Sequence, residues 1–145
     1  MKFIPQSIPD IFLIQPEIYG DSRGYFFETF RQDEFEQAIG RKIDFVQDCE
    51  SQSSKNTLRG LHFQLPPFAQ SKLVRVIKGK VLDVAVDIRK GSPTFGQYVA
   101  VELNDNNKYQ LFVPRGFAHG FVVLSEIAIL SYKLGNYYSP EHERG

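Results

Sequence analysis

The most regular segment of the chain reads Val81-Leu82-Asp83-Val84-Ala85-Val86-Asp87-Ile88. Its β-branched residues favour an extended backbone, and its period of two predicts a strand. Val81 and Ala85 alternate with Asp83 and Asp87 at this spacing, so one strand face is expected to carry both carboxylates. For the two aspartates the pattern favours structural charge on a solvated face.

Further strand segments lie on both sides of this one and are separated by Gly, Pro and Asn. The sequence Lys78-Gly79-Lys80 predicts a hairpin turn, and Asn104-Asp105-Asn106-Asn107 predicts another turn. Many short strands at regular spacing predict a sandwich or a barrel. The other predicted strands are 25–30, 43–48, 58–64, 73–77, 98–103, 110–113, 120–124 and 127–134.

One short helix is predicted over residues 33–39. Asp33 is expected to cap it, with Glu36 three residues later, and Gly40 is expected to end it. Phe35 and Ile39 share one face of this helix, which predicts a peripheral element packed on a β-structure. No repeat or linker divides the chain, so we expect a single domain over residues 1–145.

The overall composition limits the classes of partner. Seventeen basic residues balance seventeen acidic ones, so no global field favours nucleic acid or an anionic membrane surface. Cys49 is the only cysteine, which excludes an internal disulfide and fits a reducing compartment. The N-terminus lacks a signal-peptide pattern, and no segment approaches the roughly 20 apolar residues that span a bilayer. A soluble cytoplasmic protein is expected.

Polar motifs interrupt the apolar strands at three places. Arg59-Gly60-Leu61-His62-Phe63-Gln64 comes first, Lys72 follows, and Pro114-Arg115-Gly116-Phe117-Ala118-His119-Gly120-Phe121 comes last. Together they gather cations, a potential general base and glycines that permit close packing. This composition is suited to holding an anionic ligand beside a proton-transfer group.

Several separated motifs, in the same order, resemble those of dTDP-4-dehydrorhamnose 3,5-epimerases. They are Asp21-Ser22-Arg23-Gly24-Tyr25-Phe26-Phe27-Glu28, Gln47, the segment from Leu58 to Gln64, Gln70-Ser71-Lys72-Leu73-Val74, Asp83-Val84-Ala85-Val86-Asp87-Ile88-Arg89, Gly91-Ser92-Pro93-Thr94-Phe95-Gly96, and the segment from Pro114 to Phe121.

The resemblance implies an all-β, cupin-like double-sheet jelly roll, to which the predicted short peripheral helix is added. It also implies inversion of C3 and C5 of dTDP-4-dehydro-6-deoxy-D-glucose, giving dTDP-4-dehydro-L-rhamnose in dTDP-L-rhamnose biosynthesis. Neither a metal nor an organic cofactor is implied. The expected partners are the dTDP-sugar and a second copy of the chain, in a homodimer whose N-terminal segment reaches the neighbour's site.

The same resemblance implies three catalytic residues. His62 is the general base, Tyr132 is the proton donor across the sugar, and Lys72 places positive charge near the oxygen that bears the enolate charge. Taken alone, each has a plainer interpretation: a hydrogen-bonded core histidine, a packed tyrosine and a solvated lysine at a strand edge.

Substrate contacts are implied along most of the chain. Arg23 and Arg59 grip the pyrophosphate through the planar guanidinium, and Tyr138 stacks on the thymine. Cys49 stands where the family usually has Asn, so a thiol replaces an amide at this contact. The remaining implied contacts are Phe26, Glu28, Gln47, His119 and Glu143.

Related proteins continue beyond the position of Gly145 with a segment that carries the Asp orienting the base histidine, and we expect this chain to lack that segment. An orienting carboxylate supports both the tautomer and the charged form of a catalytic histidine. Asp83 and Asp87 are the candidates to replace it sterically, although the sequence does not establish that either reaches His62.

Three other functions are compatible with parts of the pattern. A metal-dependent cupin enzyme has few ligands available, because only His62, His119 and His142 exist and no His-x-His pair occurs. A non-catalytic nucleotide-sugar-binding module needs the pyrophosphate cations but no proton-transfer groups. A single-centre epimerase would use the same groups at one carbon. Proton exchange at C3 and C5 separates the last two functions from the double epimerase.

Overall fold

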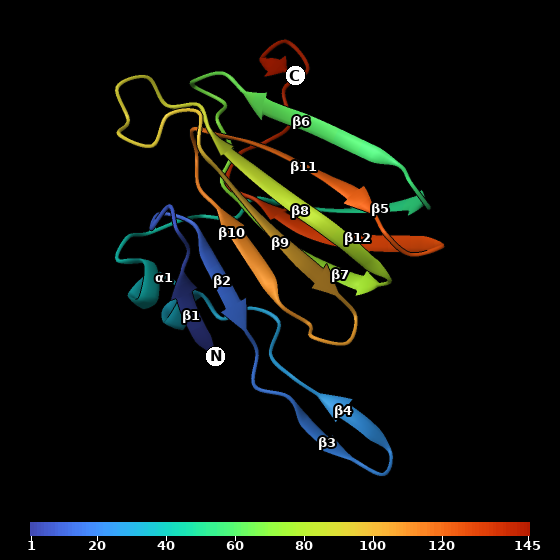
Figure 1. The fold of residues 1–145 in the computed structure, drawn as a ribbon. Helices are drawn as coiled ribbons and strands as arrows, with labels where there is room; N and C mark the ends of the chain where they lie inside the picture. The colour runs from blue at the N-terminus through green and yellow to red at the C-terminus, as the bar shows by residue number, and fades with distance from the viewer.

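Two antiparallel β-sheets face each other in the computed structural model, which describes residues 1–145 (Figure 1). One sheet has six strands in the order β1-β2-β10-β7-β12-β5, and the other has five in the order β13-β6-β11-β8-β9. Buried side chains from both sheets form the main core between them, among them Val74, Leu111, Val81 and Val123. The predicted all-β, double-sheet architecture with one short helix is confirmed.

The strands are short, as their spacing along the chain predicts. In chain order the elements are β1 (Lys2–Pro5), β2 (Phe12–Gln15), β3 (Tyr19–Asp21), β4 (Gly24–Phe26), α1 (Gln32–Ile39), β5 (Gln47–Ser54), β6 (Leu58–Gln64), β7 (Lys72–Lys78), β8 (Lys80–Asp87), β9 (Tyr98–Asn104), β10 (Gln110–Val113), β11 (Phe117–Val123), β12 (Ile127–Leu134) and β13 (Glu143–Arg144).

Strand β8 follows its predicted pattern, but the predicted solvation of its aspartates is wrong. Val81, Asp83, Ala85 and Asp87 all lie on the inner face, and each is fully buried. Both carboxylates are tolerated there because each finds hydrogen-bond donors: Asp83 contacts the imidazole of His119, and Asp87 contacts a group of donors led by Arg89. The period of two correctly identified the residues that share a face. It could not show which face is buried, because that depends on the opposite sheet.

The two predicted turns both carry the chain from one sheet to the other. At Lys78-Gly79-Lys80 the chain bends at Gly79, but the predicted hairpin is wrong, because β7 and β8 belong to different sheets. Gly79 has φ 93°, and a Cβ there would lie 2.1 Å from the carbonyl oxygen of Ile127, so only glycine fits this crossing. The Asn104 turn is confirmed, with the Asn104 side chain accepting from the following backbone amides.

Two strand predictions fail where the polarity pattern is misleading. The predicted strand 43–48 is displaced, because β5 begins at Gln47 and continues through the polar sequence to Ser54. Both faces of β5 are polar, so it carries no alternation signal. The predicted strand 25–30 is observed only as β4, which ends at Phe26, and β1 and β2 were not predicted.

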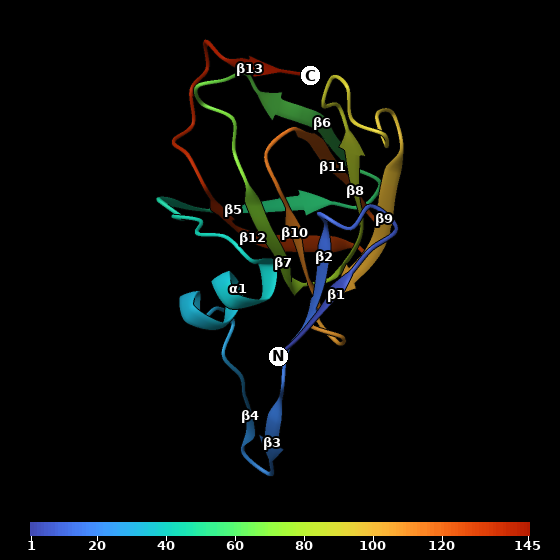
Figure 2. The ribbon, with the colours of Figure 1, turned by 90° about the vertical axis from the view of Figure 1, so that its left-hand side faces the viewer.

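Helix α1 packs on the outer face of the six-stranded sheet (Figure 2). Its Phe35 is buried in a second cluster with Leu73 of β7 and Phe112 of β10. Gly40 ends it at φ 76°, as predicted, but the predicted Asp33 cap is wrong. Arg31 occupies the N-cap position without a side-chain cap bond, because Asp33 lies inside the first turn and pairs with Arg31 instead. No helix is long and apolar enough to cross a membrane.

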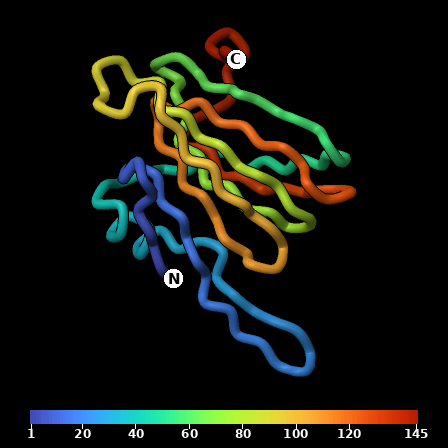
Figure 3. The backbone as a smooth tube through the Cα atoms, viewed as in Figure 1, coloured from blue at the N-terminus to red at the C-terminus, as the bar shows by residue number.

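Strands β3 and β4 pair only with each other and form a hairpin that extends away from the two sheets (Figure 3). The aromatic side chains of Tyr19, Tyr25 and Phe26 are all more than half exposed on it. This hairpin arm therefore contributes no core to the chain that carries it, although its composition is typical of a contact surface.

Candidate active site

The six-stranded sheet turns Tyr132 and Lys72 toward the opposite sheet. Tyr132 of β12 stands between Val74 of β7 and Cys49 of β5, and Lys72 of β7 stands opposite Leu134. Residues directly opposite one another share a face of the sheet. Because Val74 is buried in the core between the sheets, this register places the phenol, the ammonium and the Cys49 thiol on the inner face.

The five-stranded sheet turns His62 and Arg59 inward by means of a β-bulge. His62 of β6 pairs with His119 of β11, but two residues further along β11 the partner of Phe121 is Arg59. Residues three apart on a regular strand point to opposite faces, and the extra residue of a bulge reverses this relation. The guanidinium of Arg59 and the imidazole of His62 therefore share the inner face.

Two glycines make this bulge possible. Gly60 has φ 110°, and a Cβ on it would lie 2.6 Å from the Cα of Gly120. A Cβ on Gly120 would in turn lie 2.6 Å from the carbonyl oxygen of Arg59. The close backbone contact between β6 and β11 thus excludes any side chain at both positions, which explains the glycines of the two predicted motifs.

His62, Lys72 and Tyr132 line one cavity of about 460 Å³ and an adjoining cavity of about 300 Å³. His62 approaches from the five-stranded sheet, and Tyr132 approaches from the six-stranded sheet. The larger of these two cavities adds Arg59 and His119. The smaller one adds the other predicted contacts that the chain brings together, namely Gln47, Cys49, Tyr138 and Glu143.

Glu143 is the carboxylate beside His62. Its Oε1 lies 3.5 Å from Nδ1 of His62, whose side chain is half exposed. Its Oε2 accepts a hydrogen bond of 2.7 Å from the Tyr138 hydroxyl, and this bond raises the pKa of the phenol. Neither Asp83 nor Asp87 contacts His62, so the steric replacement considered from the sequence is not observed for them.

Lys72 is half-buried and lies close to negative charge. Burial lowers the pKa of its ammonium group, and the charges of Asp83 and Glu143 oppose that shift. A partly desolvated ammonium is a strong hydrogen-bond donor to an oxygen that gains negative charge during a reaction. The interior therefore brings an imidazole, a phenol and an ammonium group into one space.

The Gln47 side chain connects Cys49 to Tyr138. Its Nε2 donates to the Cys49 Sγ at 3.2 Å, and its Oε1 accepts from the Tyr138 backbone amide at 3.0 Å. The thiol that stands where the family usually has an amide is thus part of the cavity wall. Tyr138 itself is more than half exposed at the cavity edge.

The sequence did not predict the contacts that two further residues make in the site. Ser53 of β5 is buried and accepts a hydrogen bond of 2.8 Å from Nε of Arg59, across the gap between the sheets. Asp83 holds His119, with both carboxylate oxygens 2.8 and 2.9 Å from Nε2. No sequence signal marks Ser53 within its polar strand. Asp83 was visible as a carboxylate in an apolar strand, but it was interpreted as solvated.

Three predicted contacts lie apart from these cavities in a single chain. Arg23 is exposed on the hairpin arm, where it pairs with Asp21 at 2.7 Å. Phe26 is exposed on the same arm, and Glu28 lies 3.6 Å from Arg31. The structure therefore separates the predicted site into an interior part and a part on the hairpin arm.

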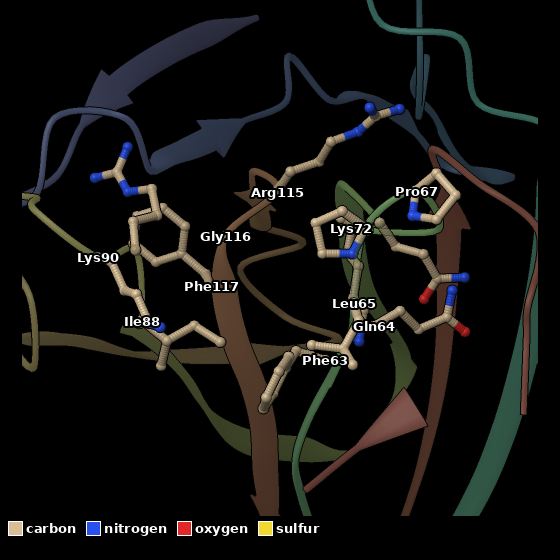
Figure 4. A pocket seen from close by; sticks show the side chains of 14 residues that line it. Phe63, Gln64, Leu65, Pro67, Lys72, Ile88, Lys90, Arg115, Gly116 and Phe117 are labelled. Carbon is tan, nitrogen blue, oxygen red and sulfur yellow. The ribbon is translucent and has the colours of Figure 1, made fainter. Parts of the chain in front are cut away.

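A third cavity, of about 560 Å³, adjoins the site at Lys72 (Figure 4). Loops after β6, β8 and β10 enclose it, and Arg89, Lys90 and Arg115 accompany Lys72 on its walls without any carboxylate. It is larger than the other two cavities but is lined by neither His62 nor Tyr132. Both of the smaller cavities, in contrast, are lined by these two residues.

No group of three or more His, Cys, Asp or Glu side chains is arranged to hold a metal ion. His119 and Asp83 are engaged with each other, and His62 faces Glu143. Stable metal sites in proteins generally need three or more converging ligands. The metal-dependent alternative thus finds no ligand set among these residues.

An all-β double sheet with polar groups turned into the space between its layers is the architecture of cupin-like enzymes. The model of one such family, described as dTDP-4-dehydrorhamnose 3,5-epimerase, matches residues 5–145. The chain belongs to this family.

Individual relatives are similar in sequence over nearly the whole chain. A dTDP-4-dehydrorhamnose 3,5-epimerase of Shigella flexneri is 57% identical over 145 residues, which are 100% of this chain and 80% of the relative. The enzyme of the same name from Salmonella typhimurium is 59% identical over 99% of this chain and 78% of its own length. A crystal structure of a dTDP-6-deoxy-D-glucose-3,5-epimerase from Legionella pneumophila, in complex with dTDP-4-keto-L-rhamnose, has a TM-score of 0.95 and 51% identity, covering 98% of this chain and 75% of that one.

Proposed function

We propose that this protein is an epimerase that inverts C3 and C5 of dTDP-4-dehydro-6-deoxy-D-glucose and produces dTDP-4-dehydro-L-rhamnose, a step of dTDP-L-rhamnose biosynthesis. One observation carries the proposal beyond family membership: His62 and Tyr132 come from opposite sheets and line the same cavities together with Lys72. Inversion of a carbon requires an acid and a base on opposite sides of it, and this interior offers both.

The reaction begins with removal of a proton from a carbon beside the C4 ketone. His62 accepts this proton through Nε2, because its Nδ1 faces Glu143. An imidazole is suited to the step, because one ring nitrogen can accept a proton while the other faces a carboxylate. The electron pair of the broken C–H bond moves into the enolate, whose negative charge falls on O4.

Lys72 stabilises that enolate charge. Its ammonium is partly desolvated, so an interaction with O4 strengthens as the charge develops in the transition state. Tyr132 then returns a proton to the carbon from the opposite face, which completes the inversion at that centre. The same groups act a second time at the other carbon that flanks the ketone.

The remaining interior residues bind the substrate. Arg59, which Ser53 holds across the two sheets, pairs with the pyrophosphate, and Tyr138 stacks on the thymine. The exposed position of Tyr138 at the cavity edge supports that role. The other polar groups of the two cavities contact the sugar and the nucleoside, namely Gln47, Cys49, His119 and Glu143.

The hairpin arm completes the site of a second copy of the chain in a homodimer. Arg23, Phe26 and Glu28 lie apart from the cavities of their own chain, and the arm exposes aromatic side chains without covering any core. These features support exchange of the N-terminal segment between protomers. Light scattering tests the dimer, and cell fractionation tests the cytoplasmic location, which stays a prediction. No organic cofactor is part of the proposed chemistry.

Incubation of the substrate with the protein in D2O tests the function. We expect NMR to show deuterium at both C3 and C5. Label at one carbon only would identify a single-centre epimerase, and binding without exchange at either carbon would identify a non-catalytic binding module.

The variant Tyr132→Phe separates the two proton-transfer roles. Without the phenol, His62 still removes and returns a proton on its own face, so we expect deuterium exchange with loss of inversion. The variant His62→Asn is expected to lose both. If Tyr132→Phe inverted both carbons at the wild-type rate, the phenol would not be the proton donor.

A further inference from the structure

We propose that Asp83 is a positioning residue of this site: it holds the His119 ring through Nε2, so that Nδ1 is the nitrogen left to accept a hydrogen bond from the substrate. Both carboxylate oxygens of Asp83 lie within 2.9 Å of Nε2 of His119. An ionised carboxylate only accepts hydrogen bonds, so Nε2 carries the proton. The inference rests on the proposed function, because it assigns a role in binding that substrate.

Asp83 is poorly explained as a purely structural group. It is fully buried, and His119 is its hydrogen-bond partner. Asp87, on the same strand face and equally buried, instead accepts from Arg89, Ser92 and Thr94. A buried carboxylate with few donors is costly, and an apolar residue would serve packing better at such a position.

The position of His119 explains why its orientation matters. It stands directly opposite His62 in the register of β6 and β11, and both line the cavity of about 460 Å³ with Lys72. The His119 ring is buried and its only hydrogen bonds run to Asp83. A substrate hydroxyl near His62 would therefore meet Nδ1 of His119 as an acceptor. Without Asp83, the ring could adopt the other tautomer and present a donor there.

Asp83 also lies close enough to Lys72 to affect it. Its negative charge opposes the lowering of the Lys72 pKa that burial causes. A substitution at Asp83 could therefore act through Lys72 instead of His119. A double-mutant cycle distinguishes these two routes, because coupling appears only between residues that act together.

The first test needs no substrate and no variant. The chain has three histidines, so nitrogen-resolved NMR of the wild-type protein can assign each ring. We expect the His119 signals to show a proton on Nε2 and none on Nδ1 at neutral pH. The opposite neutral tautomer, or an imidazolium, would overturn the inference while leaving the proposed reaction untouched.

The second test compares Asp83→Asn, His119→Gln and the double variant in steady-state assays. We expect Asp83→Asn to lower kcat/KM on the order of 10-fold to 100-fold, mainly through KM, by analogy with partners that orient metal-bound histidines. In the His119→Gln background the same substitution is expected to change kcat/KM less than about twofold. If the effects of the two single substitutions on kcat/KM multiplied in the double variant, Asp83 would act through another group. This result would overturn the inference.

Asp87→Asn is the matched control, because it removes a second buried carboxylate from the same face of β8 without touching either proton-transfer cavity. It is expected to lower stability and leave KM unchanged. An equal rise of KM in this variant would show a general structural effect and contradict the specific role of Asp83. If the wild-type protein exchanged neither the C3 nor the C5 proton of the substrate in D2O, in contrast, the proposed function itself would be rejected.

Discussion

Two Asp-x-Arg sequences form the same local structure in very different surroundings. In Asp21-Ser22-Arg23 the Arg backbone amide donates to Oδ1 of the Asp at 2.8 Å, and Nη2 donates to Oδ2 at 2.7 Å. In Asp87-Ile88-Arg89 the same two bonds are both 3.0 Å long. The first pair lies on the hairpin arm, and the second lies at the end of β8 between the sheets.

The surroundings give the two pairs different roles. Asp21 and Arg23 have side chains that are 52% and 88% exposed, so their attraction is screened by water. Asp87 is fully buried, accepts from Ser92 and Thr94 as well, and shares Arg89 with Asp10 at 2.6 Å. The inner pair fixes the loop after β8, whereas the outer pair leaves its guanidinium in contact with solvent. Local geometry alone does not reveal this difference.

The largest effect is expected from the interior chemistry. His62→Asn should lower the rate of deuterium exchange about 10³-fold, the usual contribution of a general base. Because the His62 side chain is half exposed, the variant should unfold at the same temperature as the wild type. If this variant still exchanged protons at the wild-type rate, another residue would be the base. The assignment of proton transfer to the interior would then be wrong.

Of the two Asp-x-Arg pairs, the inner one should contribute more to the free energy of unfolding. Asp87→Asn is expected to lower the free energy of unfolding by about 3 kcal/mol, because it removes the charge of a fully buried carboxylate that accepts from Arg89, Ser92 and Thr94. Urea unfolding at pH 7 measures this loss. A change below about 0.5 kcal/mol would mean that the buried pair behaves like a surface pair.

The same pair predicts a specific acid dependence. Hydrogen bonds from Arg89, then those from Ser92 and Thr94, hold the pKa of Asp87 far below its ordinary value, although burial opposes them. A carboxyl whose folded pKa is lowered contributes stability above its unfolded pKa of about 4, and this contribution is lost as the pH falls below that value. The urea midpoint of the wild type should therefore fall more steeply below about pH 4 than that of Asp87→Asn.

The outer pair should affect substrate binding and not stability. Arg23→Ala is expected to raise KM about 10-fold through loss of a phosphate contact, with an unchanged unfolding temperature. Mixed dimers provide the sharper test. If arms are exchanged, a dimer of Arg23→Ala and His62→Asn chains contains one site with both wild-type residues, so mixing should restore activity. No recovery in verified mixed dimers would show that each arm serves its own chain.

The smallest effect is expected for Asp21→Asn, the outer counterpart of Asp87→Asn. Both partners are exposed, so the free energy of unfolding should change by less than about 0.5 kcal/mol. KM should change little, because the guanidinium of Arg23 remains. A stability loss comparable to that of Asp87→Asn would show that the arm is buried in the dimer.

Much of the fold could be predicted because apolar alternation is a local property. The strands 110–113 and 127–134 match β10 and β12, and Gly40 ends α1 as expected. Strand β5 could not be predicted, because its inner face carries Gln47, Cys49, Ser51 and Ser53 and lacks the apolar side chains of a core strand. A polar inner face removes the alternation of polar and apolar residues by which such a strand is identified.

The chemical identity of the interior groups was readable in the motifs, but their convergence was not. Arg59 and His62 are three residues apart, a spacing that places them on opposite faces of a regular strand, and only the bulge at Gly60 unites them. The contact of Ser53 with Arg59 joins two sheets, so no spacing along the chain encodes it.

The order of residues already specifies the reactive groups and the strands that they interrupt: an imidazole, a phenol, an ammonium and guanidinium groups within short extended segments. Which of the two alternating faces is buried follows from the packing of the sheets, which turns Asp83 and Asp87 inward and leaves Arg23 in water. An alternation with a period of two is the same for both faces of a strand, so it cannot distinguish them. Burial is assigned by whatever packs against one of them, and that partner comes from distant parts of the chain.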